Sequence, residues 1–266
     1  MMERLNVNQL SIGYAESIIV KDLNLSIPTG KITALVGANG SGKSTILKTM
    51  ARLMKPASGS VLLDGKSIHT QSTKEVARQL AILPQNPTAP DGLTVSELVS
   101  YGRYPHQKGF GSLTVEDRKI ISSAIEVTGM GDFSDRPIER LSGGQRQRAW
   151  IAMALAQQTD ILFLDEPTTF LDMAHQLEVL QLLQMLNERE GRTIIMVVHD
   201  LNHASRFGQH MVAIKSGTVV SEGAPVDVMT PDVLREVFGI EADIVDDPRT
   251  GLPLCLPYSL AKSKAV

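Results

Sequence analysis

One short stretch near the N-terminus places glycines, a lysine and a serine at close spacing. Gly37, Gly40 and Gly42 allow backbone conformations that turn successive N–H groups inward, and Lys43 and Ser44 follow them directly. Lys43 would supply a positive charge to the outer phosphates of a ligand, and Ser44 an oxygen for Mg²⁺. A glycine-rich turn with a surface lysine is the alternative interpretation. The complete pattern G-x-x-x-x-G-K-S instead predicts a nucleoside triphosphate site made by Gly37, Ala38, Asn39, Gly40, Ser41, Gly42, Lys43, Ser44 and Thr45.

Acidic and imidazole side chains follow two later apolar runs. Asp165 and Glu166 come after residues 161–164, and His199 comes after residues 193–198. The carboxyl ends of parallel strands meet at one edge of a sheet, where ligand chemistry collects. We expect Asp165 to face Mg²⁺, Glu166 to orient and deprotonate an attacking water, and His199 to contact the terminal phosphate. A solvated turn and a structural histidine are the alternatives.

A second candidate anion site precedes a helix predicted over residues 145–157. Ser142, Gly143, Gly144 and Gln145 lead into this helix, and its N-terminus carries the positive end of the helix dipole. An ordinary serine cap would explain Ser142 equally well in isolation.

The surrounding pattern predicts the elements that carry these residues. Residues 5–27 alternate between apolar and polar side chains, as half-buried antiparallel strands do, whereas residues 32–36 form a fully buried strand. Helix-start signals at Thr94 and Thr114 mark a helical insert, residues 88–155. Later alternation of strands and helices requires right-handed crossovers and a mainly parallel sheet flanked by helices. The predicted divisions within a single 1–266 domain are therefore a core with an antiparallel β subdomain (1–87 and 156–229), the helical subdomain (88–155), and a C-terminal helix and hairpin extension (230–266).

Composition narrows the class of protein. The 266 residues carry a formal net charge of −3, so no basic field favours nucleic acid as a partner. A single cysteine excludes an internal disulfide, and no apolar run reaches the roughly 20 residues of a membrane-spanning helix. The first residues lack the apolar core of a signal peptide. We therefore expect a cytosolic protein that can still lie against a membrane protein.

The order of these motifs resembles that of the ATPase subunits of ABC transporters. The resemblance covers essentially the whole chain and rests on the phosphate loop, Gln85, Leu141-Ser142-Gly143-Gly144-Gln145, Asp165-Glu166, Leu171-Asp172 and His199. It implies the P-loop NTPase α/β fold, with a helical insert specific to ABC proteins, and ATP and Mg²⁺ as cofactors. It also implies that two copies face head to tail.

The resemblance implies further roles. Tyr14 would stack on adenine, Gln85 would touch Mg²⁺, and Asp172 would bridge the two sites of the dimer. Ser142 and Gly144 would donate to the γ-phosphate that Lys43 of a second copy holds. Many members have Ser and Ala before Leu171, where this chain has Thr169 and Phe170.

Four segments are similar to the importer subgroup for iron–siderophore complexes and cobalamin: residues 83–85, 99–106, 233–239 and 247–253. This similarity implies an ATPase peripheral to the cytoplasmic face of the membrane. Its partners would be a polytopic permease and, indirectly, an extracytoplasmic substrate-binding protein. Ferric-siderophore uptake is the leading hypothesis, and cobalamin, haem or a metal ion is the alternative cargo. A soluble ABC-type remodelling ATPase is the other alternative.

Overall fold

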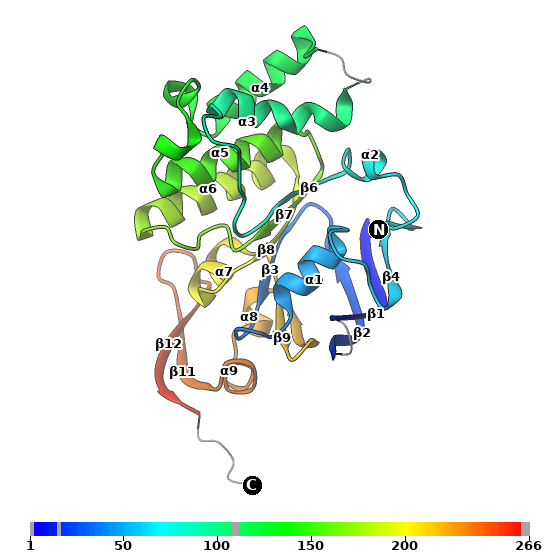
Figure 1. Cartoon of the computed structure of the whole chain (residues 1–266). Helices are drawn as coiled ribbons and strands as arrows, with labels where there is room; N and C mark the ends of the chain where they lie inside the picture. Colours follow the sequence, from blue (N-terminus) through cyan, green and yellow to red (C-terminus); the bar gives the residue numbers. More distant parts are fainter. Residues whose placement is uncertain (1–2, 15–16, 108–111, 262–266) are drawn as a thin grey trace. The chain divides into compact units, whose positions relative to one another are not determined.

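The computed structural model describes residues 3–14, 17–107 and 112–261. The chain divides into two compact units, drawn in Figure 1: a first unit of Met1–Thr70 and Thr193–Val266, and a second unit of Gln71–Arg192. The predicted helical insert, residues 88–155, falls within the second unit, and its boundaries stay a prediction. Parallel strands and helices occur in both units, as the predicted α/β class requires.

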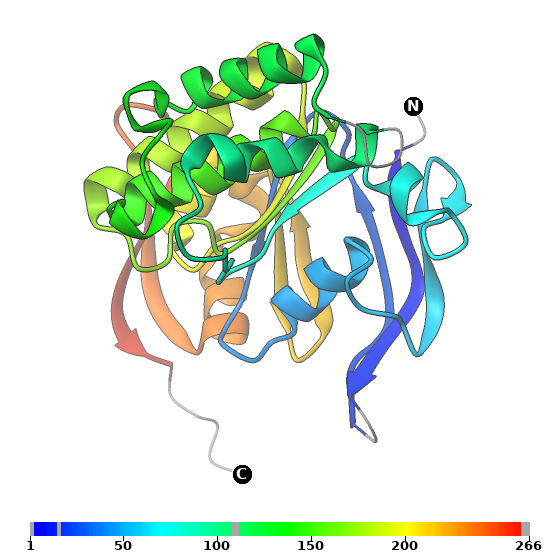
Figure 2. The same cartoon turned by 45° about the horizontal axis from the view of Figure 1, so that its top comes forward.

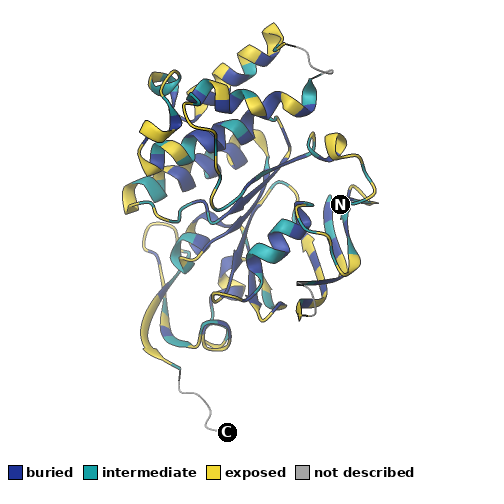
Figure 3. Ribbon diagram, in the orientation of Figure 1, coloured by how far each residue is buried: buried dark blue, intermediate teal, exposed yellow. Residues whose placement is uncertain are grey.

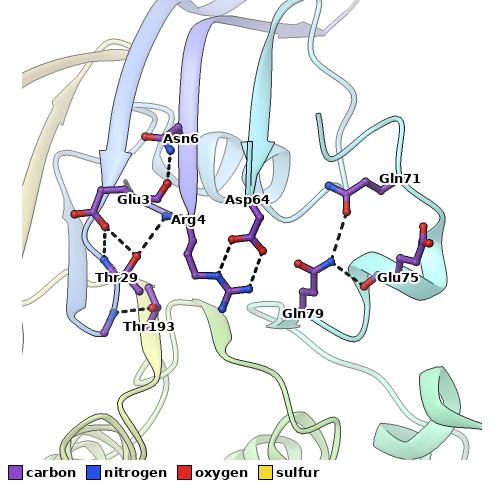
Figure 4. A network of polar contacts seen from close by, with 10 residues as sticks. Glu3, Arg4, Asn6, Thr29, Asp64, Gln71, Glu75, Gln79 and Thr193 are labelled. Atoms are coloured by element: carbon purple, nitrogen blue, oxygen red, sulfur yellow. Dashed lines mark hydrogen bonds and ion pairs between the residues drawn. The ribbon is translucent and has the colours of Figure 1, made fainter. Parts of the chain in front are cut away.

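The first unit contains the predicted antiparallel sheet. Its strand order is β2-β1-β4-β5, with bounds Ser17–Ile27, Leu5–Tyr14, Ser58–Leu63 and Lys66–Ser67. Along the end of β2, Leu23, Leu25 and Ile27 are buried alternately, as expected for strands with one solvated face. Arg4 forms a two-point ion pair with Asp64, at 2.8 and 2.9 Å, and so ties the start of β1 to the end of β4 (Figure 4).

The parallel strands of the first unit carry its core. β3 (Ile32–Val36) lies between β8 (Thr193–Val197) and β9 (His210–Lys215) and runs parallel to both. β10 (Thr218–Gly223) pairs with β9 in the antiparallel sense. Every residue of β3 and β8 is buried, which explains their continuous apolar sequences (Figure 3).

In the part of the first unit that the structure describes, the remaining elements are α1 (Lys43–Met50), α7 (Leu201–Phe207), α8 (Pro225–Val228), α9 (Pro231–Phe238) and the β11–β12 pair, Ile240–Asp246 with Pro253–Leu260. The predicted C-terminal helix is confirmed: Thr230 caps α9, and Gly239 ends it with φ 68°. The two strands that follow, orange and red in Figure 2, pair in the antiparallel sense, and β12 packs against α7.

The second unit is mainly helical. Its two strands, β6 (Leu80–Leu83) and β7 (Ile161–Asp165), pair in parallel. Its α-helices are α2 (Thr73–Val76), α3 (Val95–Ser100), α4 (Val115–Val127), α5 (Gly143–Ala156) and α6 (Met173–Glu190). Three 3₁₀ helices connect them: η1 (Tyr101–His106), η2 (Gly131–Phe133) and η3 (Ile138–Arg140). Among the residues that the structure describes, no helix combines the length and apolar content needed to cross a membrane.

Capping and one buried ion pair order the helices of the second unit. The helix-start signals are confirmed, because Thr94 and Thr114 each form a reciprocal capping box, with Glu97 and Asp117 respectively. Arg103, which is 5% exposed, donates to Asp117 Oδ1 at 2.8 Å and to the carbonyl of Ala156 at 2.7 Å. One guanidinium therefore ties η1 to the start of α4 and the end of α5.

Candidate functional site

The phosphate loop connects β3 to α1 in the first unit. The φ angles of Gly37, Gly40 and Gly42 are 152°, 77° and 100°, in the region that side-chain-bearing residues rarely adopt. At Gly37 a close approach adds a second constraint, because a Cβ there would lie 2.2 Å from the carbonyl oxygen of Ile214. The predicted conformational reason for these glycines is confirmed.

Lys43 lies against this loop. It is 5% exposed, and its Nζ donates to the carbonyls of Gly37 at 2.8 Å and Ala38 at 2.9 Å. Ser41 Oγ is also buried, and it has no hydrogen-bond partner among the described residues. α1 begins at Lys43, so its first N–H groups and positive dipole end face the same loop. A buried ammonium, an orphaned hydroxyl and these N–H groups fit an anion with many acceptor oxygens, such as a triphosphate.

His199 follows β8 at the same edge of the sheet. β3 and β8 pair Leu35 with Val197, and the N–H of Val198 donates to the carbonyl of Leu35 at 3.2 Å. The two strands therefore end side by side, and His199 follows β8 at the edge where Gly37 follows β3. His199 is exposed, so its ring is accessible to a ligand. Tyr14 ends β1, but its side chain, and with it the predicted adenine contact, lies outside the described residues.

Gln85 and Glu166 meet in the second unit. β6 and β7 pair Leu83 with Leu164, so both residues follow at one edge. Gln85 Nε2 donates to Glu166 Oε2 at 2.5 Å, and Thr169 Oγ1 donates to the same oxygen at 3.0 Å. Two donors on one oxygen fix the orientation of the carboxylate. Glu166 also has φ 55°, a strained conformation of the kind that clusters at functional sites.

Asp165, the last residue of β7, is 1% exposed. A carboxylate is an oxygen ligand of the kind that Mg²⁺ prefers. Its position directly before Glu166 is as the sequence predicts.

Ser142 is the N-cap of α5, which begins at Gly143, two residues before the predicted start. Its hydroxyl accepts from the N–H of Gln145 at 3.3 Å, and Gln145 Oε1 accepts from the N–H of Ser142 at 3.1 Å. The alternative of an ordinary serine cap therefore describes the free chain correctly. Ser142 and Gly143 are nevertheless exposed, which leaves this helix end accessible to a ligand.

Gly144, unlike its neighbour, is buried against the start of α6. Asp172 caps α6, accepting from the N–H of His175 at 3.0 Å and lying 2.8 Å from His175 Nδ1. The imidazole of His175 occupies the space beside Gly144, where a Cβ would lie 2.3 Å from Cδ2. Asp172, the residue predicted to bridge the dimer, thus contacts His175, which in turn packs against Gly144 at the start of α5.

Two residues of this arrangement are missing from the sequence-based set. The hydroxyl of Thr169 donates to the carboxylate of Glu166, and the only signal for this contact in the sequence is that Thr169 lies three residues after Glu166. No sequence motif assigns a role to His175. Its place in the first turn after Asp172 is the signal that could have found it, since a side chain there reaches back to the cap.

Comparison with known proteins identifies the family. The profile of the ABC transporter family matches residues 20–169, more than half of the chain. The chain belongs to the ABC transporter family. The iron(3+)-hydroxamate import ATP-binding protein FhuC of Bacillus subtilis (strain 168) is 63% identical over 263 residues, covering 99% of this chain and 98% of FhuC. The ferric enterobactin transport ATP-binding protein FepC of Escherichia coli (strain K12) is 47% identical, with coverage of 96% and 94%.

A solved ABC cassette shares the fold. The dimeric post-hydrolysis state of the ATP-binding cassette MJ0796, bound to ADP and Pi, superposes with a TM-score of 0.72 at 32% identity, covering 83% of this chain and 98% of that one. As an ABC cassette, the chain is an ATP-binding ATPase. In the first unit, Lys43 and Ser44 begin the helix after the phosphate loop and His199 follows the neighbouring strand; in the second unit, Gln85 contacts Glu166, which directly follows Asp165.

Proposed function

We propose that this chain is the ATP-hydrolysing subunit of an importer for ferric-siderophore complexes. The observation that carries the proposal is the 63% identity to the hydroxamate import protein FhuC over 99% of the chain. The held carboxylate of Glu166 and the intact phosphate loop supply the chemistry that such a subunit needs.

In this proposal each residue has one task. Lys43 and the N–H groups of the phosphate loop bind the β- and γ-phosphates of ATP, and Tyr14 stacks on adenine. Glu166 accepts the proton of the attacking water, with its carboxylate oriented by Gln85 and Thr169. His199 donates to the terminal phosphate and stabilises the charge that develops there.

Ser44, Gln85 and Asp165 are the proposed Mg²⁺ contacts. All three offer oxygen atoms, the ligand type that Mg²⁺ prefers, and Asp165 is buried where its carboxylate is poorly hydrated. When bound, Mg²⁺ neutralises charge on the phosphates.

The working unit in this proposal is a head-to-tail pair of copies. Ser142, Gly143, Gly144 and Gln145 of one copy complete the nucleotide site of the other, and Asp172 bridges the two sites. ATP bound in both sites favours the closed pair, and loss of the γ-phosphate releases it. A membrane permease, and through it a substrate-binding protein, couples this switch to import at the cytoplasmic face.

Hydrolysis and dimerisation can be tested together with Glu166→Gln. The amide keeps the size of the side chain but takes up no proton, so we expect ATP binding to persist and turnover to fall by roughly 100-fold or more. Closed dimers should then accumulate with ATP in size-exclusion chromatography. Lys43→Ala, which removes the positive charge that faces the phosphates, is the matched control that should lose both ATP binding and dimer formation. Near-normal turnover of Glu166→Gln would overturn the assignment of Glu166.

The cargo requires a separate experiment. Cells that depend on this chain should take up a radioactive ferric-hydroxamate complex, and the Glu166→Gln variant should abolish that uptake. Uptake of cobalamin or haem instead would identify the alternative cargo. Recovery of the tagged chain from solubilised membranes without any polytopic permease would favour the soluble remodelling ATPase.

A further inference from the structure

The helix that follows His199 is tied to the C-terminal hairpin by side chains. Asn202, in the first turn of α7, forms a reciprocal pair with the backbone of Cys255 in β12. The N–H of Cys255 donates to Asn202 Oδ1 at 2.7 Å, and Asn202 Nδ2 donates to the carbonyl of Cys255 at 3.2 Å. An amide that both accepts from and donates to one residue fixes position and orientation together.

A second contact extends the attachment by one turn. Ser205 Oγ donates to the carbonyl of Pro253 at 2.7 Å, and Ser205 is 1% exposed. Cys255 is 4% exposed, so the contacts lie away from water, where an unmade hydrogen bond is costly. α7 is thus held to β12 at two places along its length.

Hydrogen bonds hold the chain on both sides of His199. On its N-terminal side, Val198 is bonded to the carbonyl of Leu35 in β3. On its C-terminal side, Asp200 caps α7 by accepting from the N–H of His203 at 2.8 Å. Burial, and secondarily the charge of Asp200, raises the pKa of the Cys255 thiol, which agrees with a short distance between the cap and the hairpin. His199 itself is exposed.

We propose that the C-terminal hairpin, through Asn202 and Ser205, is a positioning element that holds the His199 segment in its working geometry. The inference rests on the proposed role of His199 in ATP hydrolysis. The hairpin touches neither nucleotide nor reacting atoms in this account; it acts only through α7. A helix of seven residues is short and has little stability of its own, so its side-chain contacts with the hairpin help to fix its position.

Asn202→Ala, which removes both hydrogen bonds to Cys255, tests the proposal. We expect kcat for ATP hydrolysis to fall roughly 10- to 100-fold while KM for ATP stays unchanged, because displacement of a positioned group by about 1 Å costs up to that much. Ser205→Ala, which removes only the hydrogen bond to Pro253, should give a smaller loss and keeps the test available if the Asn202 variant folds poorly.

Two controls separate positioning from general stability. Asn187→Ala removes another amide, one that donates to the carbonyl of Arg192 at 2.7 Å, and should lower the unfolding temperature without lowering kcat. In a His199→Ala background, Asn202→Ala should cause no further loss of kcat, because the group that it positions is already absent.

The outcomes distinguish the two proposals. If His199→Ala turns over ATP normally, the proposed role of His199 is wrong. If His199→Ala is impaired but Asn202→Ala keeps wild-type kcat, the positioning role of the hairpin is wrong. Equal losses from Asn202→Ala in both backgrounds would also overturn it.

Discussion

Gly144→Ala is expected to destabilise the second unit through a contact within the chain itself. The added Cβ would lie 2.3, 2.7 and 3.0 Å from Cδ2, Cγ and Cβ of His175. The nearest of these is at least 1.1 Å closer than the ordinary contact range of 3.4–4 Å. Because the clash reaches His175 Cβ, rotating the ring alone does not relieve it. Overpacking of this kind costs about 1–3 kcal/mol.

The comparison with Gly143 isolates this effect. A Cβ on Gly143 would meet Leu171 Cδ2 at 3.4 Å, an ordinary contact, although both glycines lie in the first turn of α5. Alanine is favoured over glycine in a helix by up to about 1 kcal/mol, so Gly143→Ala should be neutral or stabilising. The net cost of Gly144→Ala should be about 0–2 kcal/mol after a gain of about 1 kcal/mol is subtracted.

Trp150 provides the assay. It is the one tryptophan of the chain, it lies in α5 and it is 8% exposed, so its fluorescence reports unfolding of this helix in urea. In a His175→Ala background the space beside Gly144 is open, and Gly144→Ala should lose its cost. A coupling free energy of about 1 kcal/mol or more between the two substitutions is expected. Equal destabilisation by Gly144→Ala with and without His175 would refute the reasoning.

Three further predictions follow from single contacts. The hydroxyl of Thr114 and the guanidinium of Arg103 lower the pKa of Asp117 to about 2. The ionised carboxylate therefore stabilises the fold fully above about pH 4, and this stabilisation is lost as the pH falls toward 2. Asp117→Asn should cost about 1–2 kcal/mol of unfolding free energy at pH 7 and should flatten this pH dependence in urea titrations. Thr169→Val, which removes the hydroxyl bonded to Glu166, should lower kcat by up to about tenfold with KM for ATP unchanged, and a serine at this position should restore it. Gly217→Ala should lower the unfolding temperature, since the new Cβ would lie 1.9 Å from a β2 carbonyl at a φ of 78°; an unchanged temperature would contradict this.

Much of the fold follows from local sequence signals. Thr94 and Thr114 begin helices because their hydroxyls and the acids three residues later satisfy the first N–H groups, a purely local interaction. Gly239 ends α9 in the left-handed conformation that glycine favours. β9 is absent from the strands predicted above, although its buried residues are apolar. Its place beside β3 depends on pairing with a strand about 180 residues away, which local periodicity does not encode.

In the candidate site, too, some features could be predicted from the sequence and others could not. The glycine conformations of the phosphate loop and the place of Glu166 after a buried strand could be predicted, because motif order and strand ends determine them. The contacts of Thr169, His175 and Asn202 could not, because each depends on the direction in which one side chain points in the folded chain.

The attachment of α7 to β12 also has a consequence for synthesis. Asn202 and Cys255 are 53 positions apart, so at 5–20 residues per second a ribosome makes the partner about 3–10 s after the helix. Throughout that interval the helix that follows His199 lacks its hydrogen bonds to β12. The contacts that tie α7 to β12 therefore form late, after the rest of the chain up to the hairpin has been made.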